Sequence, residues 1–247
     1  MARLTISNPE KRGALDRPIL DALAGTLPQL TARCVVLTGE GTVFSAGYDV
    51  GDLGDGTVAE RAGALVANPF ETALQALDEH PWPVVAALNG HTIGGGLELA
   101  LACDLRVAAE PATFGMPPGR LGLVYSHTGL RRFVDAIGGP RTRELFLTAT
   151  RIDSATALAW GLVNRVAGTD QLSQAAIALA TEIAARAPLA QRGNKRVIGA
   201  LLDGRATVTD AIERELLALR VDSLSSDDFR EGLRAFAEKR PPQWTGR

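Results

Sequence analysis

Cysteine is scarce in this chain, and neither sign of charge dominates it. Cys34 and Cys103 are the only two cysteines among 247 residues, and each lies within an apolar run. We therefore expect two buried free thiols in a reducing compartment, and no disulfide framework or metal site. The 26 Lys and Arg residues nearly balance the 28 Asp and Glu residues, and no long basic block is present. This balance argues against nucleic acid or an anionic membrane surface as partner and favours a small molecule.

Long hydrophobic runs and the common nucleotide-binding loops are also missing. No stretch approaches the roughly 20 uninterrupted apolar residues of a membrane span, and the N-terminal "MARLTISNPEKRGALD" has no apolar signal core. The protein is therefore expected to be cytoplasmic. Neither GxGxxG nor GxxxxGKS/T occurs, so the usual nucleotide loops are excluded. With 46% hydrophobic residues, the chain can bury one large core, or a core plus a small appendage.

The hydrophobic pattern changes once along the chain. Up to about Gly168, short β-branched runs such as "CVVLTG" and "PVVAALNG" alternate with helical stretches, which is typical of parallel strands linked by helices. After Gly168 the pattern is helical only, with apolar residues three and four apart. We therefore predict an α/β core followed by a helical region. The Gly-rich and Ala-rich segment Gly51–Pro69 is the most flexible-looking part of the chain.

Two glycine-containing turns carry the chemical signal. "FSAGYD", from Phe44 to Asp49, ends a buried-looking strand with small residues and then a bulky Tyr48. "NGHTIGGGLELALACD" ends another strand, and its three glycines lead into a helix with Glu98 in the first turn. Glycines at a helix start leave backbone N–H groups free to meet an incoming oxygen. On this stretch alone, a purely structural turn, with Glu98 complementing the helix dipole, is an equal alternative.

Taken together, the motifs identify a family. "VVLTGEGTVFSAGYDVGDL", then "PWPVVAALNGHTIGGGLELALACDLRVAAEPATFGMP" and finally "EGLRAFAEKRPPQW" resemble the enoyl-CoA hydratase/isomerase, or crotonase, superfamily over almost the whole chain. The resemblance implies an α/β fold, a crotonase-like spiral of ββα units. Residues 1–187 would form the acyl-CoA-binding core, and residues 188–247 a helical region that assembles a homotrimer or hexamer. The substrate would be an acyl-CoA thioester, with coenzyme A as part of the substrate and no separate cofactor or metal.

The resemblance also implies roles for residues of the two turns. The backbone N–H groups of Tyr48 and Gly95 would form an oxyanion hole around the thioester carbonyl, and the Tyr48 ring could wall the acyl pocket. Asp49 would more often anchor its turn than do chemistry. The positions assigned to substrate binding around these turns are Ala46, Asp49, Val50, Gly94, Pro117 and Pro118.

Two further segments match the family's coenzyme A contacts. "NPEKRGALD" places Arg12 and Ala14 near the nucleotide, with Gly13 where the family usually has Asn. Relatives normally carry a β-hairpin ahead of this segment, so either a strand is missing or the natural start lies further upstream. "AFAEKR" places Phe236 and Lys239 at positions that reach the adenine and phosphate end from a neighbouring protomer.

The sequence departs from the family at the second catalytic position. Hydratases of the family use two glutamates, and Glu98 matches the first of them. The second follows "FGxP", where this chain has Pro118, which can neither donate nor accept a side-chain proton. Downstream, "LGLVYSHTGLRRF" supplies Tyr125 and His127 and resembles the methylmalonyl-CoA decarboxylase branch, in which a tyrosine at this position lies near the substrate carboxylate.

Three readings of the function therefore stay open. They are a hydratase or isomerase, a decarboxylase, and a non-catalytic relative that binds CoA or RNA. The catalytic residues that we predict are Glu98, Tyr125, Tyr48 and Gly95. His127 could donate a proton or cap the next helix, and we favour the capping role; His80 and His91 are expected in turns.

Overall fold

Two sheets form the centre of the protein. The computed structural model describes residues 1–49, 69–120, 124–202, 214, 215, 218, 222 and 226–247. The larger sheet is parallel, in the order β1 (Ala2–Ile6), β2 (Val35–Gly39), β4 (Val84–Leu88), β6 (Leu105–Ala109) and β9 (Arg165–Ala167). The smaller sheet is ordered β3 (Val43–Ser45), β5 (His91–Ile93), β7 (Thr113–Gly115) and β8 (Ile152–Asp153), of which only β8 runs antiparallel to its neighbour.

A strand–strand–helix unit repeats along the chain. In each unit the first strand joins the large sheet and the second joins the small sheet. The helices that complete the units are α3 (Glu71–Glu79), α4 (Gly95–Ala102) and α5 (His127–Thr148). Central strands β2 and β4 are buried along their whole length, as expected of parallel strands covered on both faces. The predicted spiral of ββα units is confirmed.

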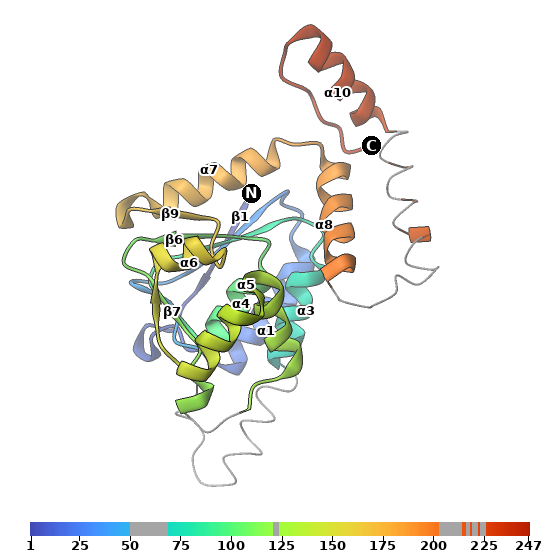
Figure 1. Ribbon diagram of the computed structural model, residues 1–247. Helices are drawn as coiled ribbons and strands as arrows, with labels where there is room; N and C mark the ends of the chain where they lie inside the picture. The colour runs from blue at the N-terminus through green and yellow to red at the C-terminus, as the bar shows by residue number, and fades with distance from the viewer. Residues whose placement is uncertain (50–68, 121–123, 203–213, 216–217, 219–221, 223–225) are drawn as a thin grey trace.

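Alternate residues of the central strands face two separate cores. Val35 and Leu37 of β2 belong to the main core, while Val36 lies in a second cluster beneath α7 (Leu172–Ala184), because side chains of a strand alternate between its faces. Figure 1 shows α7 along one side of the large sheet. The elements gathered on the other side are α1 (Arg17–Thr26), α3, α4 and α5.

The described secondary-structure elements after Gly168 are all helical, as the hydrophobic pattern predicts. The remaining helices are α6 (Ser154–Trp160), α8 (Pro188–Leu202) and α10 (Asp227–Glu238), and the short 3-10 turns are η1 (Pro9–Lys11), η2 (Leu27–Gln29), η4 (Pro118–Arg120) and η5 (Thr169–Gln171). In Figure 1, α10 stands apart from the two sheets. The segment Gly51–Pro69, expected to be flexible, lies outside the described residues up to position 68. No helix in the described ranges is long and apolar enough to span a membrane.

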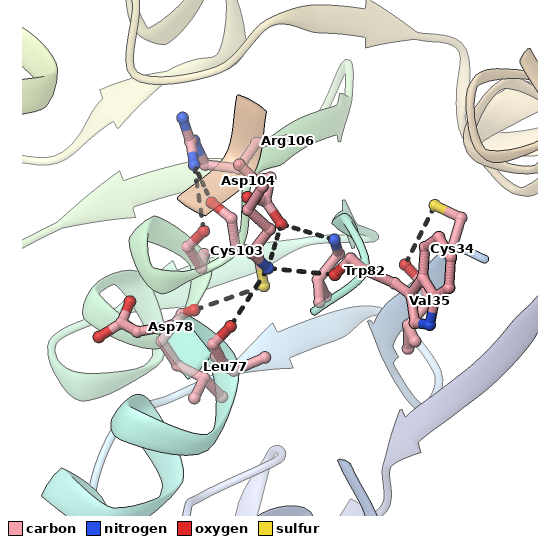
Figure 2. A network of polar contacts seen from close by, with 12 residues as sticks. Cys34, Val35, Leu77, Asp78, Trp82, Cys103, Asp104 and Arg106 are labelled. Atoms are coloured by element: carbon pink, nitrogen blue, oxygen red, sulfur yellow. Dashed lines mark hydrogen bonds and ion pairs between the residues drawn. The ribbon is translucent and has the colours of Figure 1, made fainter. Parts of the chain in front are cut away.

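A partly buried lysine joins α8 to the core. The Lys195 ammonium donates to the carbonyls of Leu77 (3.3 Å) and Trp82 (3.1 Å) and to the Asp104 carboxylate (2.8 Å). Figure 2 labels the three acceptor residues. Asp104 also accepts the Val84 N–H at 2.7 Å. Lys195 therefore ties α8 to α3 and to the segments that directly precede β4 and β6.

Both cysteines are buried and free, as the sequence predicts. Burial raises the pKa of Cys34 to about 11 and that of Cys103 to about 12, so neither thiol ionises readily at neutral pH.

The histidine predictions are partly wrong. Ser126 caps α5, because its hydroxyl accepts the Gly129 N–H at 3.1 Å, and His127 is the first residue of the helix. His91 begins β5, where its ring contacts the Thr113 hydroxyl at 2.7 Å, so it is not in a turn. His80 does follow the last residue of α3.

Candidate active site

The turn after β3 holds the first backbone N–H of the site. The Leu15 N–H donates to the Gly47 carbonyl at 2.7 Å, and the Asp49 N–H donates to the Leu15 carbonyl at 3.3 Å. These bonds fix the backbone on both sides of Tyr48, whose own N–H donates to no described residue. Gly47 has a φ of 96°, and a Cβ there would lie 2.9 Å from the Ile93 carbonyl oxygen. The turn therefore needs glycine for its conformation and for its contact with β5.

The glycine triplet sets a second N–H beside the first. Gly94 has a φ of 56°, and its N–H donates to the Gly115 carbonyl at 2.9 Å. Gly95 is the first residue of α4, and its N–H has no acceptor among the described residues, as is usual in the first turn of a helix. A Cβ on Gly47 would lie 3.4 Å from the Gly95 nitrogen. The backbone segments that carry the two N–H groups, of Tyr48 and Gly95, are therefore in contact.

Glu98 is buried in the first turn of α4 and bonded to a tyrosine from another element. Tyr125 precedes α5, and its hydroxyl donates to Oε2 of Glu98 at 2.5 Å. A Cβ on Gly129 would lie 2.6 Å from the Tyr125 ring and 2.8 Å from Oε1 of Glu98. Only glycine at this position lets the first turn of α5 approach the pair so closely.

Burial dominates the electrostatics of this cluster. Burial raises the pKa of Glu98 above the usual range of a glutamate, while the Tyr125 hydrogen bond and the Arg132 charge oppose that rise. Arg132 of α5 makes two contacts with the Asp78 carboxylate of α3, at 3.0 and 2.5 Å. Burial and the Glu98 charge raise the pKa of Tyr48 and of Tyr125 well above that of a free phenol. Both phenols therefore stay protonated at neutral pH, and Glu98 is the group that can exchange a proton.

The Tyr48 ring packs directly on the start of α4. A Cβ on Gly95 would lie 2.8 Å from Cζ of Tyr48 and 3.0 Å from both ring Cε atoms. Phe70 meets the same ring edge-on, with centroids 4.7 Å apart and an interplanar angle of 81°. The ring is therefore held between a helix N-terminus and a core aromatic.

The predicted coenzyme A segment wraps the turn of Tyr48. Arg12 is exposed with a φ of 55°, and its carbonyl accepts the Ala46 N–H at 3.1 Å. Gly13 has a φ of 67°, a conformation that glycine and asparagine adopt most readily, which explains why either residue suits this position. Ala14 is buried, and its carbonyl accepts the side-chain amide of Asn8 at 3.0 Å.

Asp49 takes part in an ion pair of this turn. Its carboxylate is 8% exposed and lies 2.6 Å from the Lys11 ammonium. Asp49 thereby links the turn after β3 to the 3-10 turn η1.

The other predicted positions lie partly at the site. Ala46 is exposed in the turn of Tyr48, and Pro117 is half-buried, with its Cδ 3.9 Å from the position of a Cβ on Gly94. Pro118 is buried at the start of η4. Val50 lies outside the described residues. Phe236 is in α10, and Lys239 follows that helix as an exposed residue. Figure 1 shows α10 far from α4, so these two positions do not join the site within one protomer.

Gly129 and Arg132 are site residues that the sequence predictions missed. The signal for Gly129 was a glycine within the first turn of a helix, where glycine costs stability unless something packs closely against it. Arg132 has no local signal, because its partner Asp78 is 54 positions away. Within the described part of the chain, no three His, Cys, Asp or Glu side chains are grouped so that they could hold a metal ion.

Comparison with known proteins places the chain in one family. The enoyl-CoA hydratase/isomerase family model matches residues 1–247. A protein of Mycobacterium bovis named as an enoyl-CoA hydratase is 36% identical over 246 residues, covering 98% of this chain and 95% of its own. A Bacillus subtilis protein named as an enoyl-CoA hydratase/isomerase is 35% identical over 254 residues, with coverages of 100% and 95%. The crystal structure of an enoyl-CoA hydratase from Bacillus anthracis superposes with a TM-score of 0.89 at 32% identity, covering 99% of this chain and 95% of that one.

Proposed function

Because the chain belongs to the enoyl-CoA hydratase/isomerase family, we propose that it transforms an acyl-CoA thioester by way of a thioester enolate. The observation that carries the proposal is the pair of N–H groups of Tyr48 and Gly95, which lie on touching backbone segments and have no acceptor among the described residues. An enolate concentrates negative charge on one oxygen. Two preorganised donors stabilise that oxygen, and loss of one donor typically raises the barrier by about 3 kcal/mol.

Glu98 supplies the proton chemistry of the proposed reaction. In a hydration, the carboxylate takes a proton from water as the water oxygen bonds to the β-carbon, and the electrons of the double bond move onto the thioester oxygen. Glu98 then returns the proton to the α-carbon, which restores the carboxylate and completes the addition of one water. The raised pKa of buried Glu98 favours both halves of this exchange near neutral pH. Coenzyme A enters only as part of the substrate, so no cofactor is needed.

Pro118 makes a single-carboxylate mechanism part of this proposal. A buried proline stands where we expect the second glutamate of the family's hydratases. Its side chain has no proton to give, and the Tyr125 hydroxyl instead bonds to Glu98. One carboxylate assisted by a phenol would therefore replace two carboxylates.

The absence of a carboxylate at Pro118 and the presence of Tyr125 beside Glu98 also favour a second candidate function, the decarboxylation of a malonyl-type CoA thioester. In that reaction the C–C bond breaks, CO₂ leaves, and the bonding electrons move onto the thioester oxygen as the enolate. The enolate carbon then takes a proton from water. This chemistry needs the two N–H donors but no strong base, and the Tyr125 hydroxyl would bond to the departing carboxylate.

Coenzyme A binding is assigned to two segments. Arg12 and Ala14 would contact the nucleotide from the turn beside Tyr48. Phe236 and Lys239, which lie far from the site of their own protomer, would reach the nucleotide of a neighbouring one in a homotrimer or hexamer. Light scattering checks the assembly, and a monodisperse monomer of the full chain would contradict it.

A mass-spectrometric screen tests the chemistry. The purified protein is incubated with crotonyl-, longer enoyl-, methylmalonyl- and ethylmalonyl-CoA. Addition of 18 Da to an enoyl thioester supports hydration, and loss of CO₂ from a malonyl-type thioester supports the second candidate. If the protein binds CoA thioesters but changes none of them, the proposed catalysis is wrong. The Glu98→Gln variant separates the two reactions, because it should remove hydration and leave decarboxylation nearly intact.

A further inference from the structure

We propose that the ring of Tyr48 closes the acyl end of this site, so that the protein accepts CoA thioesters of short acyl groups and rejects long ones. The inference rests on the proposed acyl-CoA function and adds its substrate class. It makes Tyr48 a specificity-determining residue through its side chain, in addition to the role proposed for its N–H.

The first support is the position of the ring. Its Cζ and both Cε atoms lie within 3.0 Å of the point where a Cβ on Gly95 would stand. The ring therefore covers the residue whose N–H would hold the thioester oxygen, on the side where a side chain would project. The ring also packs against Phe70, a core residue, with centroids 4.7 Å apart and ring planes at 81°. This contact restricts the rotamers that Tyr48 can adopt.

The second support is what surrounds the hydroxyl end of the ring. Cζ of Tyr48, which carries the hydroxyl, lies 2.8 Å from the position of a Cβ on Gly95, in the same helical turn as Glu98. The charge of Glu98 accordingly raises the pKa of Tyr48. Tyr125 is in turn bonded to Glu98 at 2.5 Å and packs edge-on against Phe146, with centroids 5.5 Å apart. The Tyr48 ring is thus one member of a wall of aromatic side chains around the Glu98 carboxylate.

The path of an acyl group follows from these contacts. With its oxygen on the N–H groups, the thioester must bring its α- and β-carbons to Glu98, because that carboxylate exchanges protons with them. Further carbons would continue past Glu98, in the direction that Tyr48, Tyr125 and Phe146 fill. Tyr48 and Tyr125 are half-buried and pack against the main core, which includes Phe146. Extra methylenes would therefore require these rings to change rotamer or the backbone to shift.

A binding experiment with saturated thioesters tests the inference without requiring turnover. Butyryl-CoA and decanoyl-CoA are titrated by calorimetry into the wild type, Tyr48→Ala and Tyr48→Phe. The wild type should bind butyryl-CoA at least about tenfold more tightly, a discrimination typical of a shaped apolar pocket. Tyr48→Ala should lose or reverse this preference, and Tyr48→Phe, which keeps the ring, should retain it. An unchanged preference in Tyr48→Ala would overturn the inference.

A thermal-melting cycle tests the ring contact itself. Gly95→Ala adds a methyl group that overlaps the Tyr48 ring, so it should lower the melting temperature in the wild type and be tolerated in the Tyr48→Ala background. If the two effects simply add, the ring does not lie on Gly95 and the inference fails.

The outcomes separate the inference from the proposed function. Binding of butyryl-CoA with the expected preference, but without turnover of any enoyl or malonyl thioester, contradicts the proposed catalysis and supports the inference. Turnover of long and short enoyl thioesters at equal kcat/KM supports the catalysis and contradicts the inference. Failure of every thioester to bind contradicts both.

Discussion

The Tyr125 hydroxyl donates a 2.5 Å hydrogen bond to the Glu98 carboxylate, and so joins the segment before α5 to the first turn of α4. This bond lies at a site where burial alone would favour a neutral carboxylic acid. By donating to the charged form, Tyr125 keeps the carboxylate available as a base. It also fixes which way the carboxylate points. Any reaction at this site therefore depends on the pair and not on Glu98 alone.

The first prediction concerns this pair. Because the Tyr125 bond lowers the pKa of Glu98, Tyr125→Phe should raise that pKa further. If Glu98 acts as the base, the acid limb of the kcat/KM profile against pH should move to higher pH in the variant. The variant should then lose more of the wild-type rate at neutral pH than at pH values well above the limb. A uniform loss at every pH, with the limb unmoved, would mean that Tyr125 acts on the substrate and not through Glu98.

Local sequence rules predicted the parts of the site that depend on backbone conformation. The turns at Gly47 and Gly94 need positive φ values, and glycine signals such positions directly. The paired carboxylate and phenol could not be derived from local rules, because Glu98 and Tyr125 lie 27 positions apart and meet only when α5 packs on α4. His91 was assigned to a turn because the strand β5 is only three residues long, too short to show a period of two.

The second prediction separates two roles of Gly95: donating its N–H to the substrate oxygen, and leaving room for the Tyr48 ring by having no side chain. Both Gly95→Pro and Gly95→Ala add a Cβ that meets the Tyr48 ring, but only proline removes the donor. Proline is tolerated at the first position of a helix, so the fold should survive. In the Tyr48→Ala background, which removes the overlap, kcat should fall about 100-fold or more for proline relative to alanine. Equal rates in two folded variants, checked by circular dichroism, would remove the Gly95 N–H from the mechanism.

The third prediction concerns the anchor of α8. Lys195 is 12% exposed and bonds to two carbonyls and one carboxylate. Lys195→Met keeps most of the apolar stem but removes the ammonium donor from these acceptors, of which Asp104 retains the Val84 N–H. It should therefore lower the free energy of unfolding by about 1–3 kcal/mol. Arg196→Met is the matched control on the same helix. Its pair with Glu215 is about half exposed on both sides, and its loss should cost less than about 1 kcal/mol. Equal costs in urea denaturation would show that Lys195 does not anchor the helix.

The last prediction is a pH dependence of stability that arises at His80. The ring is 3% exposed, and neither of its nitrogens has a hydrogen-bond partner in the described ranges. Burial and the neighbouring Lys195 ammonium lower the pKa of His80, and the Asp104 carboxylate and the Leu27 backbone, which approaches the ring without meeting the geometry of a full hydrogen bond, oppose them only in part. The unfolded chain therefore binds a proton at a higher pH than the folded chain does.

The sign of the effect follows from that difference. Stability from the neutral ring is fully present above the unfolded pKa of about 6.5 and is lost as the pH falls below it toward the lowered folded pKa. The melting temperature should therefore decline between about pH 7 and pH 5.5. His80→Leu cannot take up a proton and should flatten this slope, while His127→Gln, at an exposed position, should keep the wild-type slope. A decline of equal steepness in His80→Leu would show that other groups cause it, because a leucine at position 80 leaves no proton to bind there.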